Sequence, residues 1–229
     1  MKFGVVIFPG SNCDMDMIYV LEKILKQDVV QLWHKDTNLK GVDFIILPGG
    51  FSYGDYLRSG AIAKFSPIME QIIGFANAGG YVMGICNGFQ ILTESGLLPG
   101  ALLHNNSHKF ICKNIYLKTI AKDTLVTNKY GDDAIKIPIA HAEGRYFANQ
   151  ETLDLLKKNN QILFQYSDIN SEVTESANPN GSLMNIAGIC NKERNVFGMM
   201  PHPERAADKE LQNQDGRLLF DSILSSFSS

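Results

Sequence analysis

Residues 81–92 read Tyr81-Val82-Met83-Gly84-Ile85-Cys86-Asn87-Gly88-Phe89-Gln90-Ile91-Leu92, and they carry the strongest indication of how this chain folds. An apolar run of strand length leads into a helical pattern, and Cys86 stands at the junction. Gly84 and Gly88 lie two positions before and after the cysteine, where glycine lets a helix pack close to a strand. The pattern is typical of a nucleophile elbow at the carboxyl end of a strand.

Cys86 has two interpretations. In the first it is a nucleophile, whose reactive thiolate is stabilised by a helix N-terminus and by a neighbouring imidazolium. In the second it is a small buried apolar residue, as most intracellular cysteines are. The flanking glycines favour the nucleophile.

Short apolar runs alternate with helical patterns around the elbow. The runs predict buried strands at 3–8, 29–33, 44–47 and 81–85, and the helical periodicity predicts helices at 15–26, 62–78 and 88–98. Strands that alternate with helices pair in parallel through right-handed crossovers. We therefore expect an α/β fold with an open, doubly wound, mostly parallel sheet and helices on both faces. Ligand sites in such sheets lie at the carboxyl ends of the strands.

The pattern changes after residue 109. Shorter strand-like pieces at 110–117 and 134–139 predict an antiparallel excursion from the parallel sheet, and further strands are predicted at 186–190 and 196–200. A helix is predicted at 211–227. Because no repeat, low-complexity segment or linker interrupts the pattern, we expect one domain over residues 1–229.

Composition narrows the functional class. The 229 residues carry a net charge of −3 with acidic and basic residues mixed along the chain, which argues against a nucleic-acid partner. The four cysteines are widely spaced without a C-x-x-C pair, which indicates a reduced compartment. The first eight residues are too short for a secretory signal, and no apolar run reaches the roughly 18 residues of a membrane span. We expect a cytoplasmic protein.

A cysteine nucleophile needs a base and a group that orients the base. The segment Met200-Pro201-His202-Pro203-Glu204 offers both at the end of a predicted strand, and its prolines stiffen the loop. His202 is expected to take the proton of Cys86, while Glu204 fixes the imidazole tautomer. Read alone, His202 is an ordinary histidine, and it is the elbow that favours catalysis.

An attacking thiolate also needs donors for the oxyanion that forms on the substrate. Adjacent Gly49 and Gly50 follow a predicted strand and let backbone N–H groups come close. We expect the N–H groups of Gly50 and Asn87 to form the oxyanion hole. The alternative is a simple glycine turn after a buried strand.

Six separated blocks of the chain resemble one enzyme family, the class I glutamine amidotransferases, and within it the glutaminase subunits of a purine-biosynthetic synthetase. The blocks are residues 8–14, 47–58, 86–90, 97–102, 141–146 and 201–205. One departure is visible, since the family pattern has glycine where this chain has Ala142. If that position needs a positive φ, alanine would strain the loop.

The resemblance implies a reaction and a set of contacts. Cys86 attacks the side-chain amide of glutamine, forms a glutamyl thioester and releases ammonia, and water then hydrolyses the thioester. The implied glutamine-binding residues are Gly49, Phe51, Gln90 and Asn12.

The resemblance also implies partners. This chain has no G-K-[ST] phosphate loop, so the ATP and Mg²⁺ of the overall reaction are expected on a separate synthetase subunit, with a third, small accessory subunit, and no cofactor is expected here. His141, Glu143 and Arg145 are expected to face the synthetase or the ammonia path. Their alternative is a polar loop with ordinary ion pairs.

Some features stay outside this scheme. Cys13 also follows a strand but lacks flanking glycines, so we expect a loop residue near the pocket. His104 and His108 have helical spacing in a segment that does not predict a helix, and no metal site is expected. Two other classes remain open: another cysteine hydrolase such as a γ-glutamyl hydrolase, and a non-catalytic glutamine-sensing or scaffold subunit.

Overall fold

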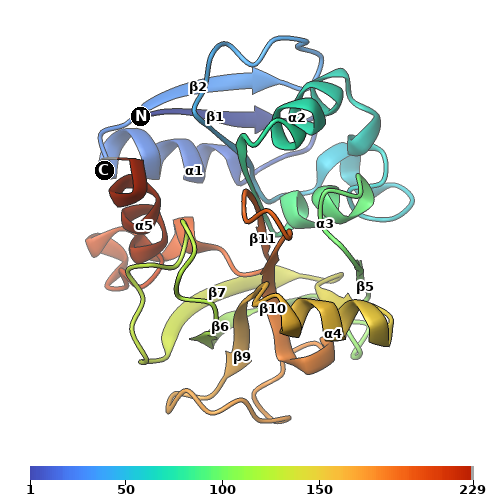
Figure 1. Ribbon diagram of the computed structural model, residues 1–229, viewed down its shortest axis with the longest axis vertical. Coiled ribbons are helices and arrows are strands. Elements are labelled where there is room, and N and C mark those ends of the chain that lie inside the picture. Colours follow the sequence, from blue (N-terminus) through green and yellow to red (C-terminus); the bar gives the residue numbers. More distant parts are fainter. Residues whose placement is uncertain (228–229) are drawn as a thin grey trace.

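The computed structural model describes residues 1–227, and a mixed nine-stranded sheet dominates this range (Figure 1). Its strand order is β2-β1-β3-β4-β11-β10-β9-β6-β7. The strands are β1 (Lys2–Ile7), β2 (Asp28–Trp33), β3 (Phe44–Leu47), β4 (Tyr81–Ile85), β6 (Ile111–Thr119), β7 (Ile135–His141), β9 (Ile162–Ser167), β10 (Ile186–Cys190) and β11 (Val196–Met199). β5 (Ala101–Leu103) and β8 (Arg145–Phe147) pair in a small second sheet.

The helices are α1 (Asp14–Tyr19), α2 (Pro67–Asn77), α3 (Asn87–Glu94), α4 (Gln150–Lys158) and α5 (Arg217–Phe227). α1 and α5 lie on one side of the parallel strands, and α2 and α3 lie on the other (Figure 1). The strands β2, β1, β3, β4 and β11 pair in parallel. This arrangement confirms the predicted α/β fold.

The register between β4 and β11 positions the elbow. Ile85 pairs with Met199, so the chain leaves both strands at the same edge of the sheet. Cys86 follows β4, and the predicted histidine loop follows β11. The backbone N–H of Cys86 donates to the carbonyl of Met199 at 2.8 Å, so a hydrogen bond joins the two segments where they leave β4 and β11.

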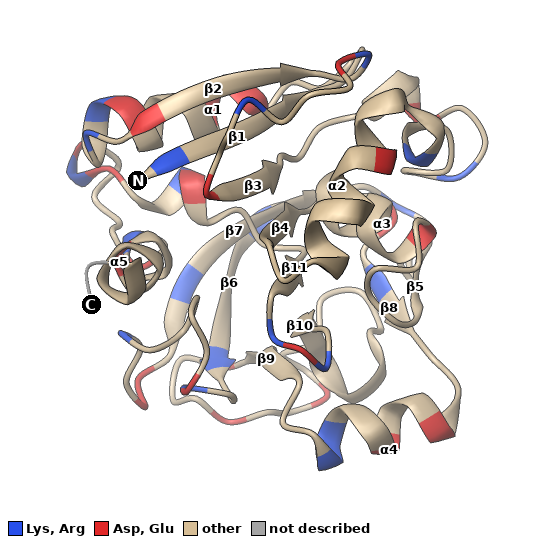
Figure 2. Ribbon diagram, turned by 45° about the horizontal axis from the view of Figure 1, so that its top comes forward, with Lys and Arg blue, Asp and Glu red and all other residues tan. Residues whose placement is uncertain are grey.

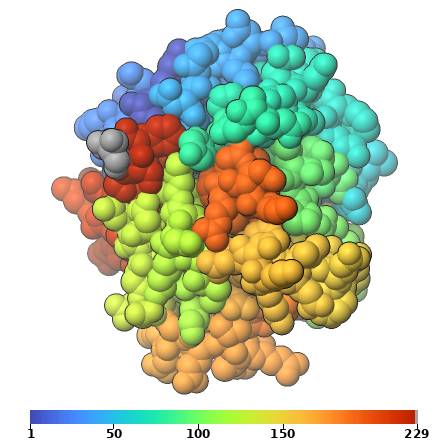
Figure 3. Space-filling model, viewed as in Figure 1, coloured from blue at the N-terminus to red at the C-terminus, as the bar shows by residue number. Residues whose placement is uncertain are grey.

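The antiparallel excursion is confirmed and forms the other half of the sheet. β10, β9, β6 and β7 pair antiparallel in that order. Ile111 faces His141 in the β6–β7 pair, which brings the end of β7 toward the same edge as the elbow. In the space-filling view the β10–β11 segment (orange) lies between the N-terminal part and the yellow-green excursion (Figure 3).

Several predicted boundaries were wrong. The C-terminal helix begins at Arg217 rather than at residue 211, because Gln212 has a left-handed backbone with a φ of 54°, which a continuous α-helix excludes. The helix predicted at 15–26 changes after Tyr19 to a π-helical turn, Val20–Ile24. The helix predicted at 62–78 breaks before Pro67, where Ser66 is extended. Helix α4 and strand β9 were not predicted.

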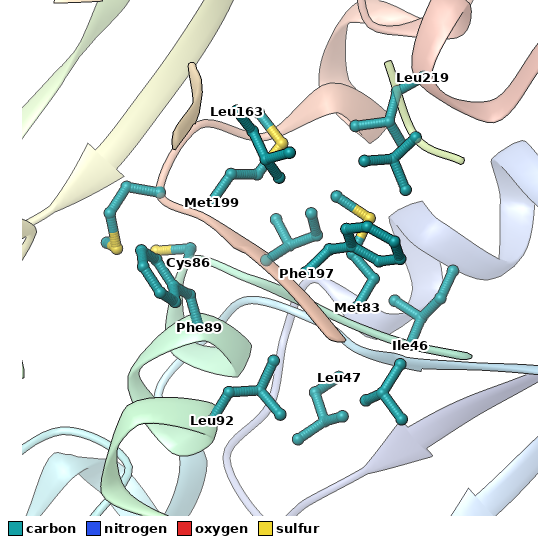
Figure 4. Packing of buried hydrophobic residues seen from close by; sticks show 14 of the residues in the cluster. Ile46, Leu47, Met83, Cys86, Phe89, Leu92, Leu163, Phe197, Met199 and Leu219 are labelled. Atoms are coloured by element: carbon teal, nitrogen blue, oxygen red, sulfur yellow. The ribbon is translucent and has the colours of Figure 1, made fainter. Parts of the chain in front are cut away.

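Buried apolar side chains fill both sides of the sheet near the elbow. Cys86 lies beside Phe89 and Met199, at the carboxyl end of the packed strands (Figure 4). Lys and Arg are interspersed with Asp and Glu along the ribbon, as the mixed charge pattern of the sequence indicates (Figure 2). In the described part of the chain, every helix is too short or too polar to cross a membrane.

Candidate active site

Cys86 adopts the strained backbone that a nucleophile elbow requires. Its φ of 50° and ψ of −105° lie outside the regions that L-residues favour. The turn is possible because α3 packs directly on the sheet: a Cβ on Gly88 would lie 1.9 Å from the carbonyl oxygen of Leu47, and a Cβ on Gly84 would lie 2.5 Å from the Gly88 carbonyl. The sequence interpretation of both glycines is therefore confirmed in geometry.

His202 and Glu204 form a buried pair beside the elbow. His202 Nδ1 lies 2.6 Å from Glu204 Oε1, and the two residues are 1% and 3% exposed. The backbone N–H of His202 donates to the carbonyl of Pro138 on β7, which fixes the loop to the antiparallel strands. Nδ1 thus donates to the carboxylate, and Nε2 is left without a hydrogen-bond partner among the described residues.

The charge of His202 follows from its surroundings. Burial lowers the pKa of the imidazole, but the negative charges of Glu204 and Cys86 outweigh it and raise the pKa well above its ordinary value. These neighbours therefore favour an imidazolium. An imidazolium next to a thiol favours the thiolate.

A small cavity opens onto the elbow. Its volume is about 200 Å³, and the residues that line it are Gly50, Phe51, Asp55, Ser59, Cys86, Gln90, Ala140, His141, Ala142 and Glu143. The volume is of the order of a small amino acid rather than of a nucleotide. A small molecule bound in this cavity would therefore lie directly against the cysteine.

Of the two predicted oxyanion donors, Gly50 lines this cavity, and Asn87 directly follows the lining residue Cys86. Gly50 has a φ of 128°, and a Cβ there would lie 2.6 Å from the backbone nitrogen of Asn12. Asn87 is the first residue of α3, where a backbone N–H has no partner within the helix. Its side chain accepts from the N–H of Ser52 at 3.1 Å, which fixes the Gly50 loop against the elbow.

The other predicted glutamine-binding residues divide into two groups. Phe51 and Gln90 line the cavity. Gly49 packs against the side chains of His202 and Cys86 instead, since an added Cβ would lie 2.7 Å from Cε1 of His202 and 3.3 Å from Cβ of Cys86. Asn12 is not among the lining residues and lies behind Gly50, so its side chain does not face the cavity.

The 141–145 segment was expected at a partner or an ammonia path. His141 is only 3% exposed, lines the cavity, and has a pKa that burial and the nearby His202 lower to about 4. Glu143 lines both this cavity and a neighbouring one of about 310 Å³, and Arg145 lines the neighbouring cavity alone. Ala142 is not among the residues with positive φ, so alanine does not strain this loop.

Two important residues were missed from the sequence. Asn105 is fully buried and holds the 141–144 loop, because its side chain bonds the carbonyl and Nδ1 of His141 and the N–H of Gly144. Asp55 lines the cavity, and burial raises its pKa to about 6. Asp55 lies within the 47–58 block of the sequence, but no role was predicted for it.

The remaining candidates also have definite places. Cys13 is 4% exposed at the start of α1, close to His202 rather than in the cavity lining. The rings of His104 and His108 lie 6.2 Å apart, and His104 Nε2 approaches Glu143 Oε1 at 3.3 Å. His104 is thus paired with a carboxylate at the mouth of the neighbouring cavity.

Comparison with known proteins agrees with this geometry. Residues 1–218 match the CobB/CobQ-like glutamine amidotransferase domain family. The chain belongs to this family. An amidotransferase of this kind accounts for a cysteine elbow, a histidine–glutamate pair and a cavity of amino-acid size in one site.

Individual relatives of this amidotransferase are similar along their whole length. This chain is 56% identical over 225 residues to the phosphoribosylformylglycinamidine synthase subunit PurQ of Moorella thermoacetica. The aligned region covers 98% of this chain and 95% of that subunit. The PurQ subunit of Synechocystis sp. is 57% identical over 220 residues, with 96% and 98% covered. A chain in the structure of PurLQS from Thermotoga maritima superposes with a TM-score of 0.86 at 43% identity, covering 99% and 98%.

Proposed function

We propose that this chain is the glutaminase subunit of phosphoribosylformylglycinamidine synthase, with Cys86, His202 and Glu204 as its catalytic triad. It hydrolyses glutamine to glutamate and ammonia. The observation that carries the proposal is the strained Cys86 elbow beside the buried His202–Glu204 pair, 2.6 Å apart. Full-length similarity to PurQ subunits supports the choice of synthase.

The first half of the reaction forms a thioester. The proton of Cys86 rests on His202 Nε2 before the reaction begins, and the thiolate attacks the side-chain amide carbon of glutamine in the cavity. The N–H groups of Gly50 and Asn87 bind the oxyanion, and each such donor is worth about 3–4 kcal/mol of barrier. His202 then gives its proton to the departing nitrogen, so that ammonia leaves and the glutamyl thioester remains.

The second half restores the enzyme. His202 takes a proton from water, the hydroxide adds to the thioester carbon, and the Cys86 thiolate leaves as glutamate forms. Glu204 holds the Nδ1 proton throughout and stabilises the imidazolium of both steps. Phe51 and Gln90 shape the cavity around the substrate.

The ammonia serves a partner. The synthetase subunit uses it with ATP to convert formylglycinamide ribonucleotide to formylglycinamidine ribonucleotide in de novo purine biosynthesis, and ATP and Mg²⁺ bind there rather than to this chain. A small accessory subunit completes the complex, as the PurLQS name of the similar structure suggests. Glu143, between the two cavities, together with His141 and Arg145, lies at the outlet toward the partner.

Two broader assignments accompany this function. We propose that the whole chain is one amidotransferase domain, since a single sheet runs through the described residues. We also propose a cytoplasmic location, where a reduced thiol at Cys86 persists; all four cysteines are free.

Labelling with a glutamine-derived diazo-ketone tests the assignment. In the reconstituted complex the reagent alkylates Cys86, free glutamine protects it, and Cys86→Ala abolishes labelling. Cys112→Ser is the matched control, because it removes a thiol that is exposed and outside the cavity lining. Labelling of Cys13 instead, or no labelling of the complex, would overturn the triad.

A further inference from the structure

The side chain of Asn87 joins the two halves of the oxyanion hole. Its backbone N–H is one expected donor, and the other belongs to Gly50 on the loop after β3. The side-chain oxygen of Asn87 accepts from the N–H of Ser52 at 3.1 Å, and Ser52 lies two residues after Gly50. Asn87 and Ser52 are 2% and 3% exposed, so water does not compete for this bond. One buried amide therefore ties the Gly50 loop to the elbow.

The amide nitrogen of Asn87 is also bound. Nδ2 donates to Asp55 Oδ1 at 3.2 Å and to Gln90 Oε1 at 2.9 Å. Gln90 lies one turn along α3 and donates to the carbonyl of Glu143. Because a backbone N–H donates and a carboxylate accepts, Ser52 and Asp55 allow one orientation of the Asn87 amide.

Ser52 and Asp55 are the two ends of a strained turn, Ser52–Asp55. Tyr53 and Asp55 have φ values of 55° and 51°, which residues other than glycine adopt at a cost. Such a backbone keeps its conformation where the surrounding structure holds it. The Asn87 amide bonds both ends of this turn, and the turn follows Gly50 directly after one intervening residue. The amide therefore helps to set the path of the chain at Gly50.

We propose that the side chains of Asn87 and Asp55 are positioning residues of the oxyanion hole. The Asn87 amide sets where the N–H of Gly50 points relative to the N–H of Asn87, and Asp55 holds that amide in place. Both side chains act through the two backbone donors. The inference rests on the proposed function, because an oxyanion forms only if Cys86 attacks a carbonyl carbon.

Exchanging donor and acceptor tests the role. Asn87→Asp keeps an acceptor for Ser52 but sets a carboxylate oxygen against Asp55, so we expect thioester formation in a single turnover of the reconstituted complex to slow by about 100-fold, with glutamine affinity little changed. The fold tolerates the change, because an acidic residue is favoured in the first turn of a helix and Asn87 begins α3. Asp55→Ala removes the acceptor and slows the step by about ten-fold. Asp55→Asn keeps a neutral acceptor and slows it by about three-fold.

The double variant Asn87→Asp/Asp55→Asn gives the decisive result. Residue 55 then donates and residue 87 accepts, so the rate of thioester formation returns to within about ten-fold of the parental rate. Two independent structural defects would instead multiply to a loss of about 300-fold. A loss of that size in the double variant overturns the positioning role.

Alkylation of Cys86 by iodoacetamide, located by mass spectrometry, separates the oxyanion hole from the triad. The thiolate attacks a saturated carbon in this reaction, and no oxyanion forms. We expect alkylation of Asn87→Asp to stay within about two-fold of the parental rate, because the change affects the oxyanion donors alone. An equal loss of alkylation and of thioester formation would place the defect in the triad or the fold and overturn the inference.

Two controls complete the design. Asn38→Asp makes the same chemical change at an exposed loop residue, whose side-chain oxygen accepts from the N–H of Lys40, and it keeps the parental rate. Cys86→Ala abolishes thioester formation. Thioester formation by Cys86→Ala would overturn the proposed function itself, whereas a failed exchange in a chain that needs Cys86 overturns the positioning role alone.

Discussion

Gly88→Ala is the most demanding perturbation of the elbow. The added methyl group would lie 1.9 Å from the carbonyl oxygen of Leu47, and both atoms belong to or are attached directly to backbone. A separation of 3.0 Å is the least that real structures show, so α3 must move from β3 by at least 1.1 Å, which is the difference between 3.0 and 1.9 Å. Overpacking of this kind costs about 1–3 kcal/mol, and a rigid backbone contact puts this position at about 3 kcal/mol.

The cost is measurable in two ways. For a chain of this size 1 kcal/mol corresponds to about 2–4 °C, so the midpoint of thermal unfolding falls by about 6–12 °C. Because Cys86 and Asn87 move with α3, a displacement of about 1 Å lowers kcat/KM for glutamine by about 100-fold. Calorimetry measures the midpoint of thermal unfolding, and glutamate release by the reconstituted complex measures kcat/KM.

Gly74→Ala is the matched control, because the same methyl group is added within helix α2 with nothing inside 4 Å. It raises the midpoint by about 1–4 °C, since alanine is favoured over glycine by about 0.5–1 kcal/mol in a helix. Its activity stays parental. If Gly88→Ala matched Gly74→Ala in stability and activity, the close approach of α3 to β3 would not be what shapes the elbow.

Three other predictions concern the site. Glu204→Gln leaves glutamine binding intact but slows thioester formation in a single turnover by about 10⁴-fold, because His202 loses the carboxylate that fixes its tautomer. An unchanged rate of thioester formation would remove Glu204 from the triad. Asp55 has a pKa raised to about 6, so the folded state binds more protons than the unfolded state, and the free energy of unfolding falls as the pH rises from about 4 to about 6. Urea unfolding at both pH values should show a smaller fall in Asp55→Asn than in the parent. An equal fall in the two proteins would contradict the raised pKa of Asp55. Asn105→Ala leaves Nδ1 and the carbonyl of His141 without their partner and lowers the free energy of unfolding by about 2–4 kcal/mol, which urea titration detects. A change below about 1 kcal/mol would mean that other contacts hold the 141–144 loop.

The sequence predicted most of the parallel half of the sheet because each of its strands is a short apolar run followed by a helical pattern. The runs at 44–47 and 81–85 agree with β3 and β4 residue for residue. It missed α4 although the sequence carries two signals of this helix: Asn149 is an N-cap that accepts from the N–H of Thr152, and Leu153 and Leu156 are buried at helical spacing. The strand β9 that follows α4 was not predicted either.

Within the site, local patterns were sufficient for some residues and not for others. The elbow glycines and the stiff His202-Pro203-Glu204 segment depend on backbone geometry, which neighbouring residues set. Asn105 and Cys13 depend on contacts with segments far along the chain. Their burial and partners are products of packing, and isolated polar or thiol residues in a sequence carry no sign of either.

The sequence by itself therefore determined the chemistry: a cysteine in a strand-to-helix turn, a histidine two residues before a glutamate, and a glycine loop. Tertiary structure alone decided which of these groups meet, because β11 pairs with β4 in a register that aligns Met199 with Ile85 and releases both loops at one edge. It also brought Cys13 close to His202 and next to Arg205. Bond geometry acts between neighbours in sequence, whereas a site assembled from several strands depends on the pairing of the whole sheet.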